Sequence, residues 1–129
     1  MLVDMRPSRF FVAPLLAVVA GCAAVSTVDG ERLALTSAEF RAYVERVFRE
    51  QNRVADAVAF ALEDEGSDAA LAAAEQRLLA ACAGVNELAT ARRDDSALGL
   101  RRSLRAARTV PECERAARLA DAELARAAR

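Results

Sequence analysis

The sequence contains no histidine, no tryptophan and no lysine, so all 18 of its basic residues are arginine, set against 19 acidic residues. Glycine and proline together supply eight residues, and aromatic side chains make up only 5% of the 129 residues. The lack of histidine removes the commonest general base and the commonest metal ligand. No apolar run reaches the roughly 18 residues that a membrane-spanning helix needs. These absences argue against a metalloenzyme and against a chain with transmembrane helices.

Alanine dominates what is present, with 32 residues, about a quarter of the chain. Alanine, leucine, arginine and glutamate favour helix, whereas the β-branched and aromatic residues that favour strands are scarce. The length allows one domain. We therefore expect an all-α protein, a small antiparallel bundle of three or four helices formed by residues 36–129.

Residues 1–21 have the form of a secretory signal peptide. Arg6 and Arg9 give a basic start, residues 10–20 form an apolar stretch of 11 residues, and the small residues Ala20 and Gly21 close it. This stretch is too short to span a bilayer, and its order of basic, apolar and small residues is typical of a secretory signal.

The tetrapeptide Val19-Ala20-Gly21-Cys22 resembles the lipobox of bacterial lipoproteins, which has an aliphatic residue, a small residue, Gly or Ala, and then Cys. The resemblance implies that Cys22 carries a diacylglycerol on its thiol and, after cleavage before it, an acyl chain on its amino group. Because Ala23, and not Asp, follows Cys22, the resemblance also implies sorting to the periplasmic face of the outer membrane. The alternative is an ordinary cleaved signal with an incidental cysteine. Three acyl chains would hold the protein stably on a bilayer.

Residues 22–35 show no helical stripe and contain Gly30. We expect this acylated N-terminus to be a flexible tether with a reach of about 45 Å.

Four helices are expected after the tether, over residues 36–63, 68–92, 97–108 and 109–127. Thr36 and Glu39 have the spacing of a capping box that opens the first helix, and Thr109 and Glu112 have it before the last. The first helix has an apolar seam with a period of 3.5 residues. Its one polar member is Gln51, which we expect to be partly exposed, with a role in fixing helix register or oligomeric state as the alternative. The seam consists of Phe40, Val44, Val47, Gln51, Val54, Val58 and Ala61.

If Cys22 carries lipid, two cysteines remain, Cys82 and Cys113, in an oxidising compartment. An antiparallel turn near residues 94–99 would bring them to similar heights on facing apolar stripes. We predict a disulfide between them, with two buried free thiols as the alternative. Two cysteines without histidine supply too few ligands for a metal site.

No motif predicts catalysis, since the chain has no nucleophile elbow and no glycine-rich phosphate loop. The acidic residues Glu63, Asp64, Glu65 and Asp68 lack the spacing of a calcium-binding EF-hand and are more simply a solvated loop at a helix end. We therefore expect a protein that is not an enzyme and that has no metal site and no cofactor beyond its covalent lipid.

Charge is unevenly distributed along the chain. Segment 22–68 has five arginines and ten acidic residues, whereas segment 92–110 has six arginines and two acidic residues. Arg101, Arg105 and Arg108 share one helical face, with Arg102 beside them, and such a basic face can bind anionic lipid or an acidic envelope protein. The simpler interpretation, which we favour, is charge complementarity with segment 22–68. The near-zero net charge argues against nucleic acid as a partner.

These features predict a small lipoprotein, anchored to the outer membrane, that serves as a binding or scaffolding module in the periplasm. The layout of signal, short helical bundle and cysteine pair resembles the pilotins, which bind a secretin and escort it to the outer membrane. The seam also resembles that of the major murein lipoprotein, which is attached to peptidoglycan through a terminal lysine that this chain lacks. A carrier of apolar ligands would need a groove of several hundred Å³ between the helices. The oligomeric state stays open.

Overall fold

The computed structural model describes residues 23–63 and 68–129. Cys22 and the predicted signal peptide over residues 1–21, together with residues 64–67, lie outside the described residues. Within the described ranges, two short strands precede four helices, α1 (Ala38–Glu63), α2 (Ala69–Arg93), α3 (Leu100–Arg108) and α4 (Val110–Ala127). The expected all-α bundle is confirmed, with the addition of a small sheet.

The first element of the described residues is a β-hairpin in which β1 (Ala24–Ser26) pairs antiparallel with β2 (Arg32–Ala34). Val25 lies opposite Leu33, and both side chains are buried on the same face of the hairpin. Gly30 adopts a φ of +87° in the turn, a conformation that costs glycine little. The flexible tether expected over residues 22–35 is therefore wrong for residues 24–34, because the hairpin buries apolar side chains against the bundle.

Helix α1 begins after Ser37, whose hydroxyl accepts a hydrogen bond of 3.0 Å from the amide of Phe40. The helix thus begins one residue later than the predicted capping box of Thr36 and Glu39 implies. The apolar seam is buried as expected from Phe40 to Val58, and Ala61 is half-buried. Gln51 is only 2% exposed, so the expectation that it is partly exposed is wrong.

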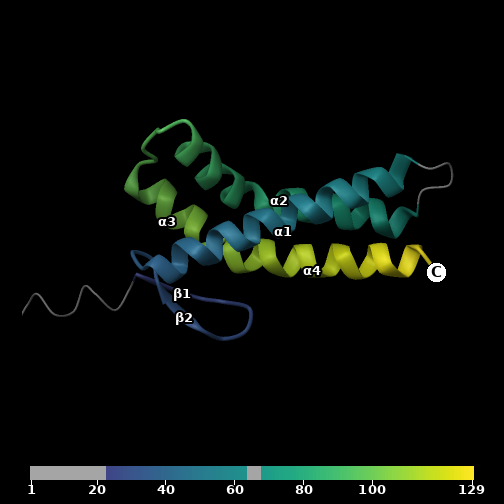
Figure 1. The fold of residues 1–129 in the computed structure, drawn as a ribbon, viewed down its shortest axis with the longest axis horizontal. Helices are drawn as coiled ribbons and strands as arrows, with labels where there is room; N and C mark the ends of the chain where they lie inside the picture. The colour runs from purple at the N-terminus through teal and green to yellow at the C-terminus, as the bar shows by residue number, and fades with distance from the viewer. Residues whose placement is uncertain (1–22, 64–67) are drawn as a thin grey trace, which may run out of the picture.

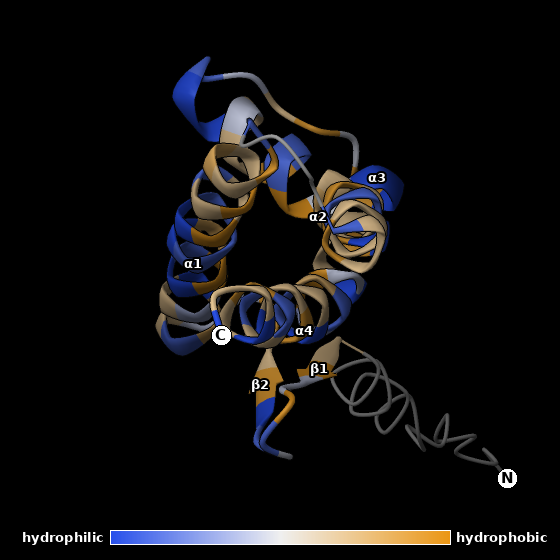
Figure 2. Cartoon of the chain, turned by 90° about the vertical axis from the view of Figure 1, so that its right-hand side faces the viewer, coloured by the Kyte–Doolittle hydropathy of each residue, from blue (hydrophilic) through white to orange (hydrophobic). Residues whose placement is uncertain are grey.

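The three long helices pack around one core, and their hydrophobic sides face one another (Figure 2). Helix α2 is antiparallel to both α1 and α4, as the order of colours along the helices shows (Figure 1). The core is built from small side chains, since its largest fully buried members are two leucines followed by valines and the cysteines. The core therefore contains little apolar volume for a chain of this length.

The predicted disulfide between Cys82 of α2 and Cys113 of α4 is confirmed. Their Cα atoms lie 4.5 Å apart, the S–S bond is 2.06 Å long, and both side chains are fully buried. The bond joins the two helices that pack against each other most extensively.

Helices α3 and α4 are joined through Thr109, whose φ of −87° and ψ of −8° are nearly helical. The Thr109 hydroxyl donates a hydrogen bond to the carbonyl of Ala106, 2.7 Å away, and caps no amide of α4, contrary to the predicted capping box. Gly84 of α2 lies directly against this junction, because a Cβ atom there would clash with the Thr109 hydroxyl and lie 3.2 Å from the Cα of Ala106. A side chain at position 84 would push α2 away from the bend.

Candidate functional site

Three features of the described residues are candidates for function: a buried polar cluster around Glu114, a groove between α2 and α4, and the basic face of α3. None of them includes the predicted anchor residue Cys22, which is outside the described residues.

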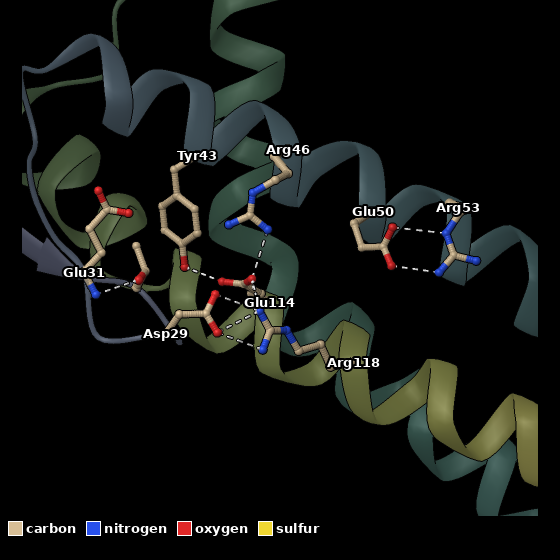
Figure 3. Close-up of polar contacts among 9 residues, drawn as sticks. Asp29, Glu31, Tyr43, Arg46, Glu50, Arg53, Glu114 and Arg118 are labelled. Carbon is tan, nitrogen blue, oxygen red and sulfur yellow. Dashed lines mark hydrogen bonds and ion pairs between the residues drawn. The ribbon is translucent and has the colours of Figure 1, made fainter.

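The Glu114 cluster consists of Asp29, Tyr43, Arg46, Glu114 and Arg118, and it joins the hairpin, α1 and α4 (Figure 3). The Tyr43 hydroxyl donates a hydrogen bond of 2.7 Å to one carboxylate oxygen of Glu114. The other oxygen accepts hydrogen bonds from Arg46 at 3.1 Å and Arg118 at 2.7 Å. Arg118 also pairs with Asp29 in the hairpin turn. One glutamate from α4 therefore ties three elements together.

Glu114 is only 3% exposed, and burial alone would raise its pKa. The hydrogen bonds from Tyr43, Arg46 and Arg118 outweigh burial and hold its pKa below the usual value. Burial, followed by the hydrogen bond to Glu114, raises the pKa of Tyr43 far above its ordinary range. A carboxylate held ionised by three donors is a weak proton acceptor, so the chemistry of this cluster is structural.

A cleft of about 420 Å³ between α1 and α4 borders the Glu114 cluster. Four arginines line it, and each is bound to a carboxylate: Arg46 to Glu114, Arg49 to Glu45, Arg53 to Glu50 and Asp121, and Arg118 to Asp29 and Glu114. Because these guanidinium groups already have carboxylate partners, the cleft is a row of ion pairs where α1 and α4 meet.

Gln51 forms a second polar contact inside the bundle. Its side-chain nitrogen donates hydrogen bonds to the side-chain oxygens of Asn86, 2.7 Å away on α2, and of Asn52, 2.9 Å away. Because Gln51 is buried, a slip of α1 along α2 would leave its amide without the partner on α2, so this contact fixes the relative register of the two helices.

A groove of about 640 Å³ runs between α2 and α4. Its apolar lining is made of short side chains and one leucine: Ala74, Ala80, Ala81, Ala116, Leu119 and Ala120. Charged side chains of both signs stand along it, namely Arg77, Glu112, Arg115 and Glu123. Leu119 is 66% exposed although it is one of the large apolar residues of α4. The groove has the size that an apolar carrier was expected to require.

The basic face of α3, formed by Arg101, Arg105 and Arg108, is exposed as predicted. It lies on the side of α3 opposite the buried Ala106 and Ala107, which attach the helix to the bundle. Arg102 forms an ion pair with Glu87 of α2. Among residues 23–63 and 68–129 no ion pair links this face to the acidic segment 22–68, so the internal complementarity that we favoured is not what the described residues show.

The acidic loop is described only in part. Asp68 accepts a hydrogen bond of 2.8 Å from the amide of Ala70 as the N-cap of α2 and also pairs with Arg126. Within the described part of the chain, no group of three or more acidic or cysteine side chains is placed to hold a metal ion. The same residues contain no helix that is long and apolar enough to cross a membrane.

Comparison of the chain with models of protein families, with curated proteins and with solved structures gives no match.

Sequence patterns missed the Glu114 cluster and the groove for different reasons. Tyr43 and Glu114 are 71 residues apart, and only the packing of α1 on α4 joins them. The groove had a visible signal, because α2 has no charged residue between Arg77 and Glu87, and this stretch contains Ala80 and Ala81 of the groove lining. The predicted arginine face, by contrast, was visible from spacing alone.

Proposed function

We propose that this protein is a lipoprotein anchored through Cys22 to the periplasmic face of the outer membrane, where it acts as a non-enzymatic docking module. The lipobox Val19-Ala20-Gly21-Cys22 supports the anchor and the compartment. The disulfide between Cys82 and Cys113 agrees with an oxidising compartment, where such bonds persist.

The observation that carries the docking function is the groove between α2 and α4. It is open to the surface, whereas a small apolar ligand is usually enclosed over most of its area. Its α4 wall extends from Glu112 to Glu123, about 16 Å, which is three turns of a helix. The alanine side chains that line the groove would let the backbone of a partner approach closely. The charged residues of both signs beside them could pair with charged residues that flank an apolar stripe on that partner. The occupant we propose is an amphipathic helix of an envelope protein.

Photo-crosslinking in the native envelope tests this docking. A photoreactive residue at position 119 is expected to crosslink to one envelope protein, at partner residues spaced by three, four or seven. The matched control is position 60, because Phe60 is 73% exposed on α1 and outside the groove. Crosslinks to partner residues spaced by two would indicate that the partner is an extended strand. Crosslinks to acyl chains would indicate a lipid carrier. Equal labelling from positions 119 and 60 would contradict a partner specific to the groove.

A pilotin-like role is the more specific alternative within this proposal. Its support is the layout, in which a disulfide fixes the last helix beside the groove of a short bundle. If the partner captured through position 119 is a secretin subunit, this alternative is favoured. A structural envelope role has less support, since the chain folds back into a bundle and does not continue the α1 seam.

A further inference from the structure

The path of the chain places Ala23, the residue that follows the predicted anchor Cys22, at one end of the bundle. Ala23 is the first described residue, and its carbonyl accepts a hydrogen bond of 2.8 Å from the amide of Leu35. This bond fixes Ala23 beside the start of α1, and Cys22 is covalently bonded to Ala23, so their Cα atoms are about 3.8 Å apart. An acyl group on Cys22 would therefore begin at the folded domain and not at the end of a long tether.

Helix α3 lies at this same end of the molecule. Figure 1 shows α3, the start of α1 and the start of β1 together at the left, whereas the end of α1 and the end of α4 lie at the right. A membrane that holds the lipid of Cys22 would consequently be close to α3 and far from Phe60.

The exposed side of α3 combines positive charge with an apolar side chain. Arg101, Arg105 and Arg108 form one row, and they have no ion pair among the residues that the structure describes. Leu100 is 75% exposed, and it lies about 100° around the helix from Arg101, on the side of the half-buried Leu104. Helices that lie in a membrane interface have this combination, with arginines at the phosphates and leucine at the acyl boundary.

From these observations we propose that the basic face of α3 docks on anionic phospholipid headgroups of the membrane that holds the anchor. This inference rests on the proposed anchoring through Cys22. It orients the bundle with the α3 end on the membrane and leaves the groove between α2 and α4 accessible along the side. Each arginine near an anionic surface contributes a comparable increment to the binding free energy, so the contributions of the three arginines add up.

The absence of tryptophan from the chain allows a direct test with a single introduced fluorophore. The acylated Leu100→Trp variant is mixed with phosphatidylcholine vesicles, with or without about one third phosphatidylglycerol. We expect a blue shift of the emission, and quenching by brominated lipid, only when phosphatidylglycerol is present. Both effects should disappear in about 1 M salt, where the screening length falls to 3 Å. The matched control is Phe60→Trp, equally exposed at the other end, whose emission should stay unchanged.

A charge-reversed variant, Arg101→Glu, Arg105→Glu and Arg108→Glu in the Leu100→Trp background, should lose the response. Flotation with the neutral vesicles reports the anchor separately from α3 docking. If the protein floats but residue 100 gives no shift with phosphatidylglycerol at millimolar lipid, the docking is wrong and the anchor stands. If the protein does not float yet residue 100 still shifts, the docking stands and the anchor is wrong. An equal shift in neutral vesicles would overturn the electrostatic basis.

Discussion

Glu114 lies at the centre of the polar contacts between α1 and α4, and Arg118 extends these contacts to the hairpin. It is nearly fully buried, and its carboxylate is bound by Tyr43, Arg46 and Arg118. Because Arg46 and Arg118 are each about half exposed, they keep contact with water while neutralising the buried charge. This arrangement avoids the usual cost of an unpaired charge in a core.

The depressed pKa of Glu114 predicts how stability depends on pH. A group whose pKa is lower in the folded than in the unfolded chain stabilises the fold above its unfolded pKa, and this stability is lost as the pH falls through the folded pKa. We expect Glu114→Gln to lower the free energy of unfolding at pH 7 by about 1.5–3 kcal/mol, the range for hydrogen bonds to charged groups.

The difference between wild type and Glu114→Gln should shrink as the pH falls below the ordinary glutamate pKa of 4.5, because the carboxyl group of the unfolded chain takes up a proton before that of the folded chain does. Urea unfolding at a series of pH values measures both effects. Glu45→Gln is the matched control, because Glu45 is also paired with an arginine but is exposed, and we expect it to change stability by less than about 1 kcal/mol. A difference between wild type and Glu114→Gln that is constant from pH 7 to pH 3 would contradict this account.

At the scale of elements, the contact between α2 and α4 carries both the disulfide and the groove. The two helices are joined at Cys82 and Cys113, and α2 approaches the α3–α4 junction closely at Gly84. Small side chains bring these helices together but bury little apolar area each. A covalent bond between the two helices therefore adds a large fraction of the stability of a small domain.

Reduction of the disulfide should lower the free energy of unfolding by about 3–4 kcal/mol, because the bond closes a loop of 31 residues in the unfolded chain. Urea unfolding with and without reductant measures the change. A Cys82→Ala/Cys113→Ala variant serves as the control and should be less stable and insensitive to reductant. An unchanged unfolding midpoint after complete reduction of the wild type would show that the bond adds no stability.

The elements also show what the sequence could predict. The α1 seam and the disulfide followed from periodicity and from the position of the turn between α2 and α3. The hairpin could have been predicted, because Asp29-Gly30 is a turn dipeptide and Val25, Thr27 and Leu33 show alternation around it. The Glu114 cluster could not have been predicted, because the partners of Glu114 on α1 and in the hairpin lie far from it in the sequence.

At the scale of the whole molecule, the hairpin changes how the domain is attached. A tether of 14 residues would let the bundle sample many orientations, whereas the chain is fixed from Ala23 onward by the bond to Leu35. If Cys22 is acylated, the α3 end must stay near the bilayer while the groove faces sideways into the periplasm. The anchor, the basic face and the groove then have separate places on one rigid body.

The measurement that tests this account most directly is the intact mass of the membrane-extracted protein, before and after reduction and alkylation. The account predicts a chain that starts at Cys22 and carries acyl groups, in which two thiols become alkylated only after reduction. A chain without acyl groups that retains residues 1–21 and has three free thiols would contradict the anchor, the disulfide and the compartment together.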